Sequence, residues 1–192
     1  RSSSSFPDTA TCEHCSAGTY SNALNAYTVC PSCPLGWVQP NPNKLFCFPC
    51  LPGEYNDQPA HTTCKQCAAN SFSTQTNRSV SCDFCGTGYS SIAGSTKCQA
   101  CEAGMYSDEV GKTCKDCGEG QYRTSSTGPA TCVLCDIGRY QDTIGQTSCL
   151  PCIPGLYNDE YGKNKCKHCA SGTSSSTQQR NISCVVCATG FA

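Results

Sequence analysis

CVLCDIGRYQDTIGQTSCLPC, residues 132–152, contains two Cys-x-x-Cys pairs separated by a Gly, a Tyr, an Asp and a second Gly. No cluster of apolar residues lies between the pairs. Cysteines in this arrangement can hold a zinc ion, form a redox centre, or form one link in a chain of disulfides. A single copy does not separate these alternatives, but the rest of the chain repeats it.

The cysteines form an unbroken tandem repeat with a period of 16–18 residues. All 22 cysteines fall into eleven Cys-x-x-Cys pairs, which are 12/15, 30/33, 47/50, 64/67, 82/85, 98/101, 114/117, 132/135, 149/152, 166/169 and 184/187. A regular repeat of this kind predicts an array of small, similar structural modules.

A second, longer period of 102 residues is also present. CFPCLPGEYNDQPAHTTCKQC at 47–67 matches CLPCIPGLYNDEYGKNKCKHC at 149–169. We therefore divide the chain into the end of a preceding repeat at 1–11, a first six-repeat block at 12–113 and a truncated second block at 114–192. We expect these residues to be a segment of a longer array.

The composition favours covalent order over an apolar core. Cysteine accounts for 22 of 192 residues, whereas Leu, Ile, Val and Phe together supply only 25. So few large apolar residues cannot offset the entropy of ordering the chain, so disulfides must supply the order. The net charge of −1, with no run of either sign, predicts neither a nucleic-acid partner nor an anionic surface as partner. No stretch approaches the ~20 apolar residues that membrane insertion requires.

The cysteine content also predicts the compartment. Reducing cytosol would keep these thiols reduced or bound to metal. Two N-glycosylation sequons, Asn77-Arg78-Ser79 and Asn181-Ile182-Ser183, point the same way. We expect a secreted or cell-surface glycoprotein with covalent glycans at Asn77 and Asn181.

Each repeat carries further marked positions, counted here from its second Cys. Gly stands at +3 in ten repeats and Asn70 in the eleventh, which predicts a tight turn with positive φ. An aromatic residue follows at +5 in most repeats, and we expect it to cover a disulfide and stack on its neighbour, an exposed carbohydrate-binding ladder being the alternative. Asp at +7 is expected to cap its own backbone rather than to bind calcium; it is found at Asp57, Asp108, Asp142 and Asp159.

These features define the fold class. The segments between pairs are 12–14 residues long and have Gly or Pro near their start, which permits two short strands and a turn but not a helix. The predicted fold is small and disulfide-rich, an elongated tandem array of ~17-residue repeats with short β-hairpins and little other secondary structure.

Structural disulfides fit the even spacing better than zinc or redox sites, because nothing groups the pairs into four-ligand sites and no helix is expected beside any pair. The preferred pairing joins the second Cys of one pair to the first Cys of the next, and each bond closes a loop of about 15 residues, worth roughly 3 kcal/mol. A ladder joining first Cys to first Cys stays open, and Cys12 and Cys187 would find partners in neighbouring repeats. The predicted bonds are Cys15–Cys30, Cys33–Cys47, Cys50–Cys64, Cys67–Cys82, Cys85–Cys98, Cys101–Cys114, Cys117–Cys132, Cys135–Cys149, Cys152–Cys166 and Cys169–Cys184.

The consensus Cys-x-x-Cys-x-x-Gly-x-Tyr-x-Asp-x-x-Gly-x(3)-Cys-x-x-Cys reads most fully in CEAGMYSDEVGKTCKDC at 101–117 and in CDIGRYQDTIGQTSCLPC at 135–152. It resembles the ephrin-receptor-like Cys-rich repeat, which is itself similar to tumour-necrosis-factor-receptor modules. The resemblance covers essentially the whole chain. It implies an extracellular location, elongated disulfide-stacked modules and no catalysis. It also supports the preferred pairing, since such modules close a Cys-x-x-Gly-x-Tyr loop onto the next Cys. Asn70 in place of Gly and Ser174 in place of Tyr depart from the pattern.

We find no catalytic arrangement, because His14, His61 and His168 are dispersed and no nucleophile–base–acid set exists. We expect no catalytic residue, metal ligand or cofactor.

The first functional hypothesis is a structural extracellular protein, part of a filament, surface hair or coat, which associates with copies or a continuation of the same chain. The alternative is a ligand-binding or adhesive receptor stalk. Its candidate contact is Trp37, expected to be exposed with Phe46 and Phe48 in the repeat at 33–48.

Overall fold

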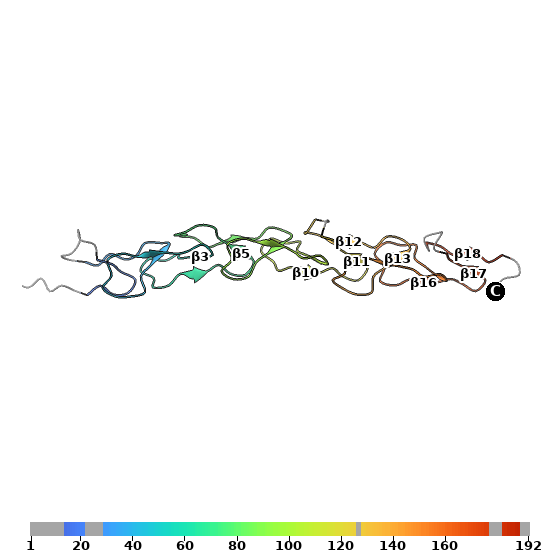
Figure 1. The fold of residues 1–192 in the computed structure, drawn as a ribbon, viewed down its shortest axis with the longest axis horizontal. Coiled ribbons are helices and arrows are strands. Elements are labelled where there is room, and N and C mark those ends of the chain that lie inside the picture. The colour runs from blue at the N-terminus through green and yellow to red at the C-terminus, as the bar shows by residue number, and fades with distance from the viewer. Residues whose placement is uncertain (1–13, 22–28, 126–127, 177–181, 189–192) are drawn as a thin grey trace, which may run out of the picture. The chain divides into compact units, whose positions relative to one another are not determined.

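The computed structural model describes residues 14–21, 29–125, 128–176 and 182–188 (Figure 1). The chain divides into two compact units, one made of residues 1–83 with 92–97 and the other of residues 84–91 with 98–192. The boundary between the two six-repeat blocks lies elsewhere, between residues 113 and 114. It was placed from the 102-residue period of the sequence and not from compactness. The block assignment therefore stays a prediction.

From Trp37 onward, each described repeat forms a small antiparallel hairpin (Figure 1), and the repeat before it forms an isolated antiparallel bridge, Thr19↔Ser32. The first strand follows the residue at +3 and the second lies inside the next Cys-x-x-Cys pair, as in the register Tyr55↔Lys65. The paired strands are β1–β2, β3–β4, β5–β6, β7–β8, β9–β10, β11–β12, β13–β14, β15–β16 and β17–β18. No helix forms among the described residues. The predicted hairpins and the absence of helix from this part of the chain are confirmed.

The strands are all two residues long. In chain order they are β1 (Trp37–Val38), β2 (Phe48–Pro49), β3 (Glu54–Tyr55), β4 (Lys65–Gln66), β5 (Ser71–Phe72), β6 (Asp83–Phe84), β7 (Tyr89–Ser90), β8 (Gln99–Ala100), β9 (Met105–Tyr106), β10 (Lys115–Asp116), β11 (Gln121–Tyr122), β12 (Val133–Leu134), β13 (Arg139–Tyr140), β14 (Leu150–Pro151), β15 (Leu156–Tyr157), β16 (Lys167–His168), β17 (Thr173–Ser174) and β18 (Val185–Val186).

The residue at +3 shapes the turn that begins each hairpin. Before β3, the Glu54 amide donates to the Leu51 carbonyl at 3.0 Å, and Gly53 has φ +86°. This is the pattern of a type II turn, with Pro52 at its preferred second position. Asn70 takes φ +63° at the same place, because Asn tolerates the left-handed region better than most residues.

Ten disulfides link successive repeats, each from the second Cys of one pair to the first Cys of the next. These are the preferred pairs given above. The Cα atoms lie 5.5–5.9 Å apart, within the usual range for a disulfide. Cys187 carries no disulfide, and Cys12 lies outside the described residues.

The interior of the protein is made of sulfur and polar groups. Among the described residues, the buried apolar ones are eleven of the disulfide cysteines and Val38. Ten polar or charged residues are buried with them, including Asn56, Arg123 and Asn158. Because buried polar groups must be hydrogen-bonded to be tolerated, the stability of each repeat depends on the partners of these side chains.

Candidate functional site: contacts between successive repeats

Main-chain hydrogen bonds connect each repeat to the next in a constant pattern. The amide at +3 donates to the carbonyl at +6 of the following repeat, as from Gly36 to Asn56 at 2.8 Å and from Gly120 to Gln141 at 2.7 Å. The amide at +3 belongs to the type II turn, and the carbonyl that accepts its hydrogen bond belongs to the hairpin of the next repeat. In these repeats the contact uses backbone atoms only, so it can recur although the side chains differ. At Gly155 the amide instead donates to the Ser175 Oγ, at 3.0 Å.

The residue at +10 makes a second contact in the opposite direction along the chain. The amides of Ala60 and Gly162 donate to the carbonyls of Cys33 and Cys135 in the preceding repeat, at 3.0 and 2.8 Å. The Gly162 carbonyl oxygen also lies only 2.0 Å from the place that a Cβ on Gly120 would occupy. Since these two glycines belong to repeats two apart, each repeat contacts its second neighbour as well as its first.

The position at +6, between the aromatic residue and Asp, holds the side chains that fill the space between repeats, and our sequence analysis missed it. In the described repeats this residue is always polar. The Asn56 and Asn158 Nδ2 atoms donate to the carbonyls of Trp37 and Arg139 in the preceding repeat, at 2.9 and 2.7 Å. Invariably polar residues inside a strand-like segment were the signal that could have identified this position.

Arg123 occupies the same +6 position with a charged side chain that is 2 % exposed. Its guanidinium donates to the carbonyls of Cys101, Glu102 and Met105 in the preceding repeat. A planar group with five N–H donors suits several converging carbonyls. Arg123 therefore satisfies three backbone acceptors of the neighbouring repeat with one side chain.

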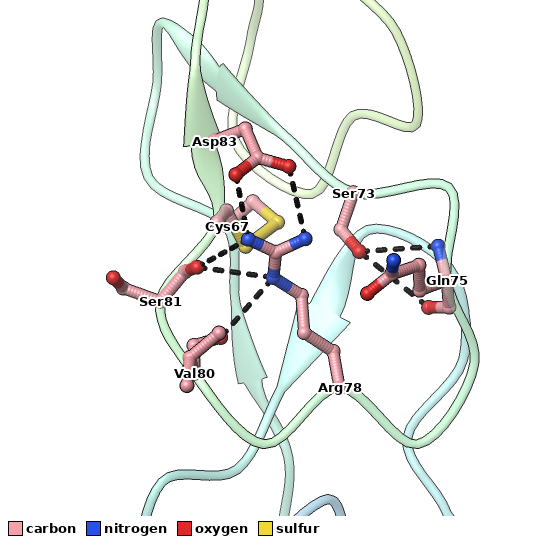
Figure 2. Close-up of polar contacts among 8 residues, drawn as sticks. Cys67, Ser73, Gln75, Arg78, Val80, Ser81 and Asp83 are labelled. Carbon is pink, nitrogen blue, oxygen red and sulfur yellow. Dashed lines mark hydrogen bonds and ion pairs between the residues drawn. A yellow bond between two sulfur atoms is a disulfide. The ribbon is translucent and has the colours of Figure 1, made fainter.

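Arg78 forms a second buried guanidinium cluster, shown in Figure 2. Its side chain is 7 % exposed and makes a bidentate pair with Asp83, at 3.0 and 2.8 Å. It also donates to the carbonyls of Val80, at 3.2 Å, and Ser81, at 2.6 Å. The hydrogen bond from Arg78 lowers the pKa of the Asp83 carboxyl, so the pair persists below the usual pH range of an aspartate.

The Arg78 cluster holds a loop that contacts the preceding repeat. The Asn56 amide donates to the Arg78 carbonyl at 3.0 Å, and the Asn77 amide donates to the Cys50 carbonyl at 2.8 Å. If the guanidinium fixes this loop, its removal should loosen both contacts.

We expect the Arg78→Met variant to exchange the Asn56 and Asn77 amide protons about 10–100-fold faster, because hydrogen bonds to a charged group contribute about 1.5–3 kcal/mol. Hydrogen exchange followed by NMR gives the rates. The control is Arg139→Met, because Arg139 is exposed and donates one bond, to the Cys149 carbonyl at 3.1 Å. Unchanged rates at Asn56 and Asn77 in Arg78→Met would show that the guanidinium does not hold the loop.

Three repeats carry a Lys–Asp–Tyr group on the hairpin surface. The Lys65, Lys115 and Lys167 Nζ atoms lie 5.9, 5.4 and 5.9 Å from the ring centroids of Tyr55, Tyr106 and Tyr157. The same ammonium groups pair with Asp57, Asp108 and Asp159 at 2.6, 2.8 and 2.6 Å. The expected stacking of successive aromatic rings is not observed, because the cross-strand neighbour of each of these rings is a lysine.

The ion pairs of these groups shift the titration of their members. The hydrogen bonds from lysine lower the pKa of Asp57, Asp108 and Asp159. Glu160 accepts from Lys163 and Lys167, which lower its pKa to about 2. The predicted backbone cap contributes as well, although the lysine is the larger cause at all three aspartates.

The proposed ligand contact Trp37 is half-buried in β1, so our expectation of an exposed indole was wrong. Its backbone pairs with Pro49, and its carbonyl accepts from Asn56. Phe46 and Phe48 are exposed, as expected, and their rings meet edge to face with centroids 5.1 Å apart.

Only the first of the two sequons has its asparagine among the described residues. Asn77 is exposed, with φ +49°, on the loop held by Arg78. Asn181 lies outside the described residues. Glycosylation at either position stays a prediction.

Two further findings concern the described residues only. Within these ranges, no three or more His, Cys, Asp or Glu side chains gather as metal ligands would. The same ranges contain no helix with the length and apolarity needed to cross a bilayer.

The hairpins, disulfides and repeated contacts define a small disulfide-rich tandem repeat protein. Residues 120–163 match the family model described as tyrosine-protein kinase ephrin type A/B receptor-like. No curated protein matches the chain. This match, the regular Cys-rich repeats and the disulfides together fit a Cys-rich, ephrin-receptor-like repeat protein, and they point to an extracellular location.

Proposed function

We propose that this chain is a structural extracellular protein, a disulfide-linked array that forms part of a filament, surface hair or coat. The observation that carries the proposal is the constant main-chain contact between repeats. Gly36 and Gly120, in different compact units, each donate to the carbonyl at +6 of the next repeat. An array joined through backbone atoms can be lengthened without a new kind of contact, as in other repeat proteins.

The same proposal covers the partners and the location. The array associates with copies or a continuation of the same chain, carries glycans at Asn77 and Asn181, and is secreted or displayed at the cell surface. It performs no catalysis. Disulfides and hydrogen bonds join each repeat to the next.

Electron microscopy of the native, unreduced protein over a concentration series tests the proposal. We expect long uniform fibres whose axial period corresponds to six repeats. Reduction with dithiothreitol followed by alkylation should abolish them, because the disulfides replace the missing apolar core. Alkylation without reductant is the control and should leave the fibres intact.

Separate particles of one length at every concentration would contradict the filament and favour a receptor or adhesive stalk. One observation supports that second candidate. Leu45, Phe46, Phe48 and Leu51 expose 69, 59, 46 and 61 % of their surface within one stretch of chain. Exposed apolar residues close in sequence can contact a protein ligand.

A further inference from the structure

We propose that the chain acts as a tether of fixed maximum length, whose covalent path under tension runs through the disulfides and bypasses the loops. The inference rests on the order of the bonds along the chain and does not depend on filament formation. Each disulfide begins at the second Cys of one pair and ends at the first Cys of the next, so the loops are closed one after another without overlap.

The path from Cys15 to Cys184 can be followed through these bonds. It crosses Cys15–Cys30, passes along Pro31 and Ser32 to Cys33, crosses Cys33–Cys47, and continues in the same way. Only the three peptide steps of each Cys-x-x-Cys pair and the disulfide itself carry tension. The 12–14 residues between bonded cysteines lie outside the path.

The maximum length per repeat follows from chain geometry. Three peptide steps extend to about 10–11 Å, and the bonded Cα atoms lie 5.5–5.9 Å apart. The oxidised path therefore reaches about 16 Å per repeat, whereas a reduced repeat of ~17 residues could reach about 60 Å. Pulling can break the hydrogen bonds between repeats, but it cannot lengthen the oxidised chain beyond this limit.

Reduction would release the loops one at a time. A thiolate of dithiothreitol attacks one Sγ, the Sγ–Sγ bond breaks, and its electron pair leaves on the other Sγ as thiolate. The second thiol of dithiothreitol then displaces the first protein sulfur and closes the oxidised reagent. In most bonds the attacked sulfur should be that of the first Cys of a pair, since Cys47 and Cys64 are half-exposed whereas their partners Cys33 and Cys50 are fully buried.

The burial of both cysteines distinguishes two of the bonds. Cys67 and Cys82 are 0 and 8 % exposed, and Cys135 and Cys149 are 0 and 7 % exposed. A reductant reaches neither sulfur of these bonds without local opening. Cys67–Cys82 and Cys135–Cys149 should therefore be the last to release their loops.

Single-molecule pulling between peptide tags fused to the two ends of the full chain tests the tether. Without reductant, we expect no extension beyond about 16 Å per repeat. With dithiothreitol at constant force, we expect ten separate steps of about 40–50 Å each, one for each disulfide.

The double variant Cys101→Ser, Cys114→Ser is the matched control, because it opens a single loop of 12 residues. It should lengthen by one step of about 40 Å without reductant, and dithiothreitol should then produce one step fewer. A reductant-free extension of the native chain far beyond the limit would overturn the proposal. So would reduction events that add no length, since overlapping loops would keep the chain closed after one bond breaks. If the variant does not fold, the proposal is still tested by the native chain, through its maximum extension without reductant and its steps with dithiothreitol.

Discussion

Gly120→Ala is expected to disrupt the contact between repeats far more than Gly172→Ala, although both glycines begin a hairpin with positive φ. Their φ values are +72° and +78°, so each substitution places an alanine in a strained conformation, at a cost of about 1–2 kcal/mol. At Gly120 the added Cβ would also lie 2.0 Å from the Gly162 carbonyl oxygen and 2.5 Å from its carbon. In the part of the chain that the structure describes, no atom lies within 4 Å of the corresponding position at Gly172.

The overlap at Gly120 must be relieved by moving backbone, which adds about 1–3 kcal/mol. We expect the amide protons of Gly120, Gln141 and Gly162 to exchange about 100–1000-fold faster in Gly120→Ala, since each 1.4 kcal/mol is a factor of ten. These amides donate to Gln141, Lys163 and Cys135. Hydrogen exchange is the suitable measurement because the disulfides remain intact while a single contact opens.

Two control variants separate the effect of backbone overlap from the effects of strain and of the substitution itself. Gly172→Ala should change exchange about tenfold, and only near its own turn, because it adds strain without overlap. Gly128→Ala, at a glycine with no positive φ and nothing within 4 Å, should leave all rates close to native. Equal effects of Gly120→Ala and Gly172→Ala would contradict the close approach of second-neighbour repeats.

Arg123→Met is expected to give the second large effect. The substitution keeps an unbranched apolar stem and removes the donors that satisfy the carbonyls of Cys101, Glu102 and Met105. Buried acceptors left without partners cost about 1–3 kcal/mol each, partly offset because a buried charge is also removed. We expect a net local loss of about 2–4 kcal/mol. The Gly104 amide, which donates to the Arg123 carbonyl at 2.8 Å, should then exchange about 30–1000-fold faster.

Arg123→Lys separates charge from geometry. An ammonium retains the positive charge but lacks the planar fork that reaches several carbonyls at once. Exchange at Gly104 should therefore lie between the native and Arg123→Met rates. A native rate in Arg123→Met would mean that the guanidinium contributes nothing to the contact, and a native rate in Arg123→Lys alone would mean that charge is sufficient.

Much of each repeat could be predicted from its sequence, because the decisive interactions are local. Gly or Asn at +3 predicted the turn, since few other residues tolerate positive φ. Short segments between cysteine pairs predicted hairpins rather than helices. Both predictions are confirmed at, for example, Gly53, Asn70 and β3–β4. The expected ring stacking is not found in three of the described repeats, because the register places a lysine opposite the ring, as Lys65 lies opposite Tyr55.

The spacing of the cysteines and glycines by itself determined that this chain is an array of disulfide-rich hairpins. Only the tertiary structure decided what fills the space between them. The burial of Asn56 and Arg123, and the need for room at Gly120, arise from repeats about 20 and 40 residues apart in the chain. No local preference specifies such contacts, because a polar residue at +6 is equally compatible with solvent until the neighbouring repeat covers it.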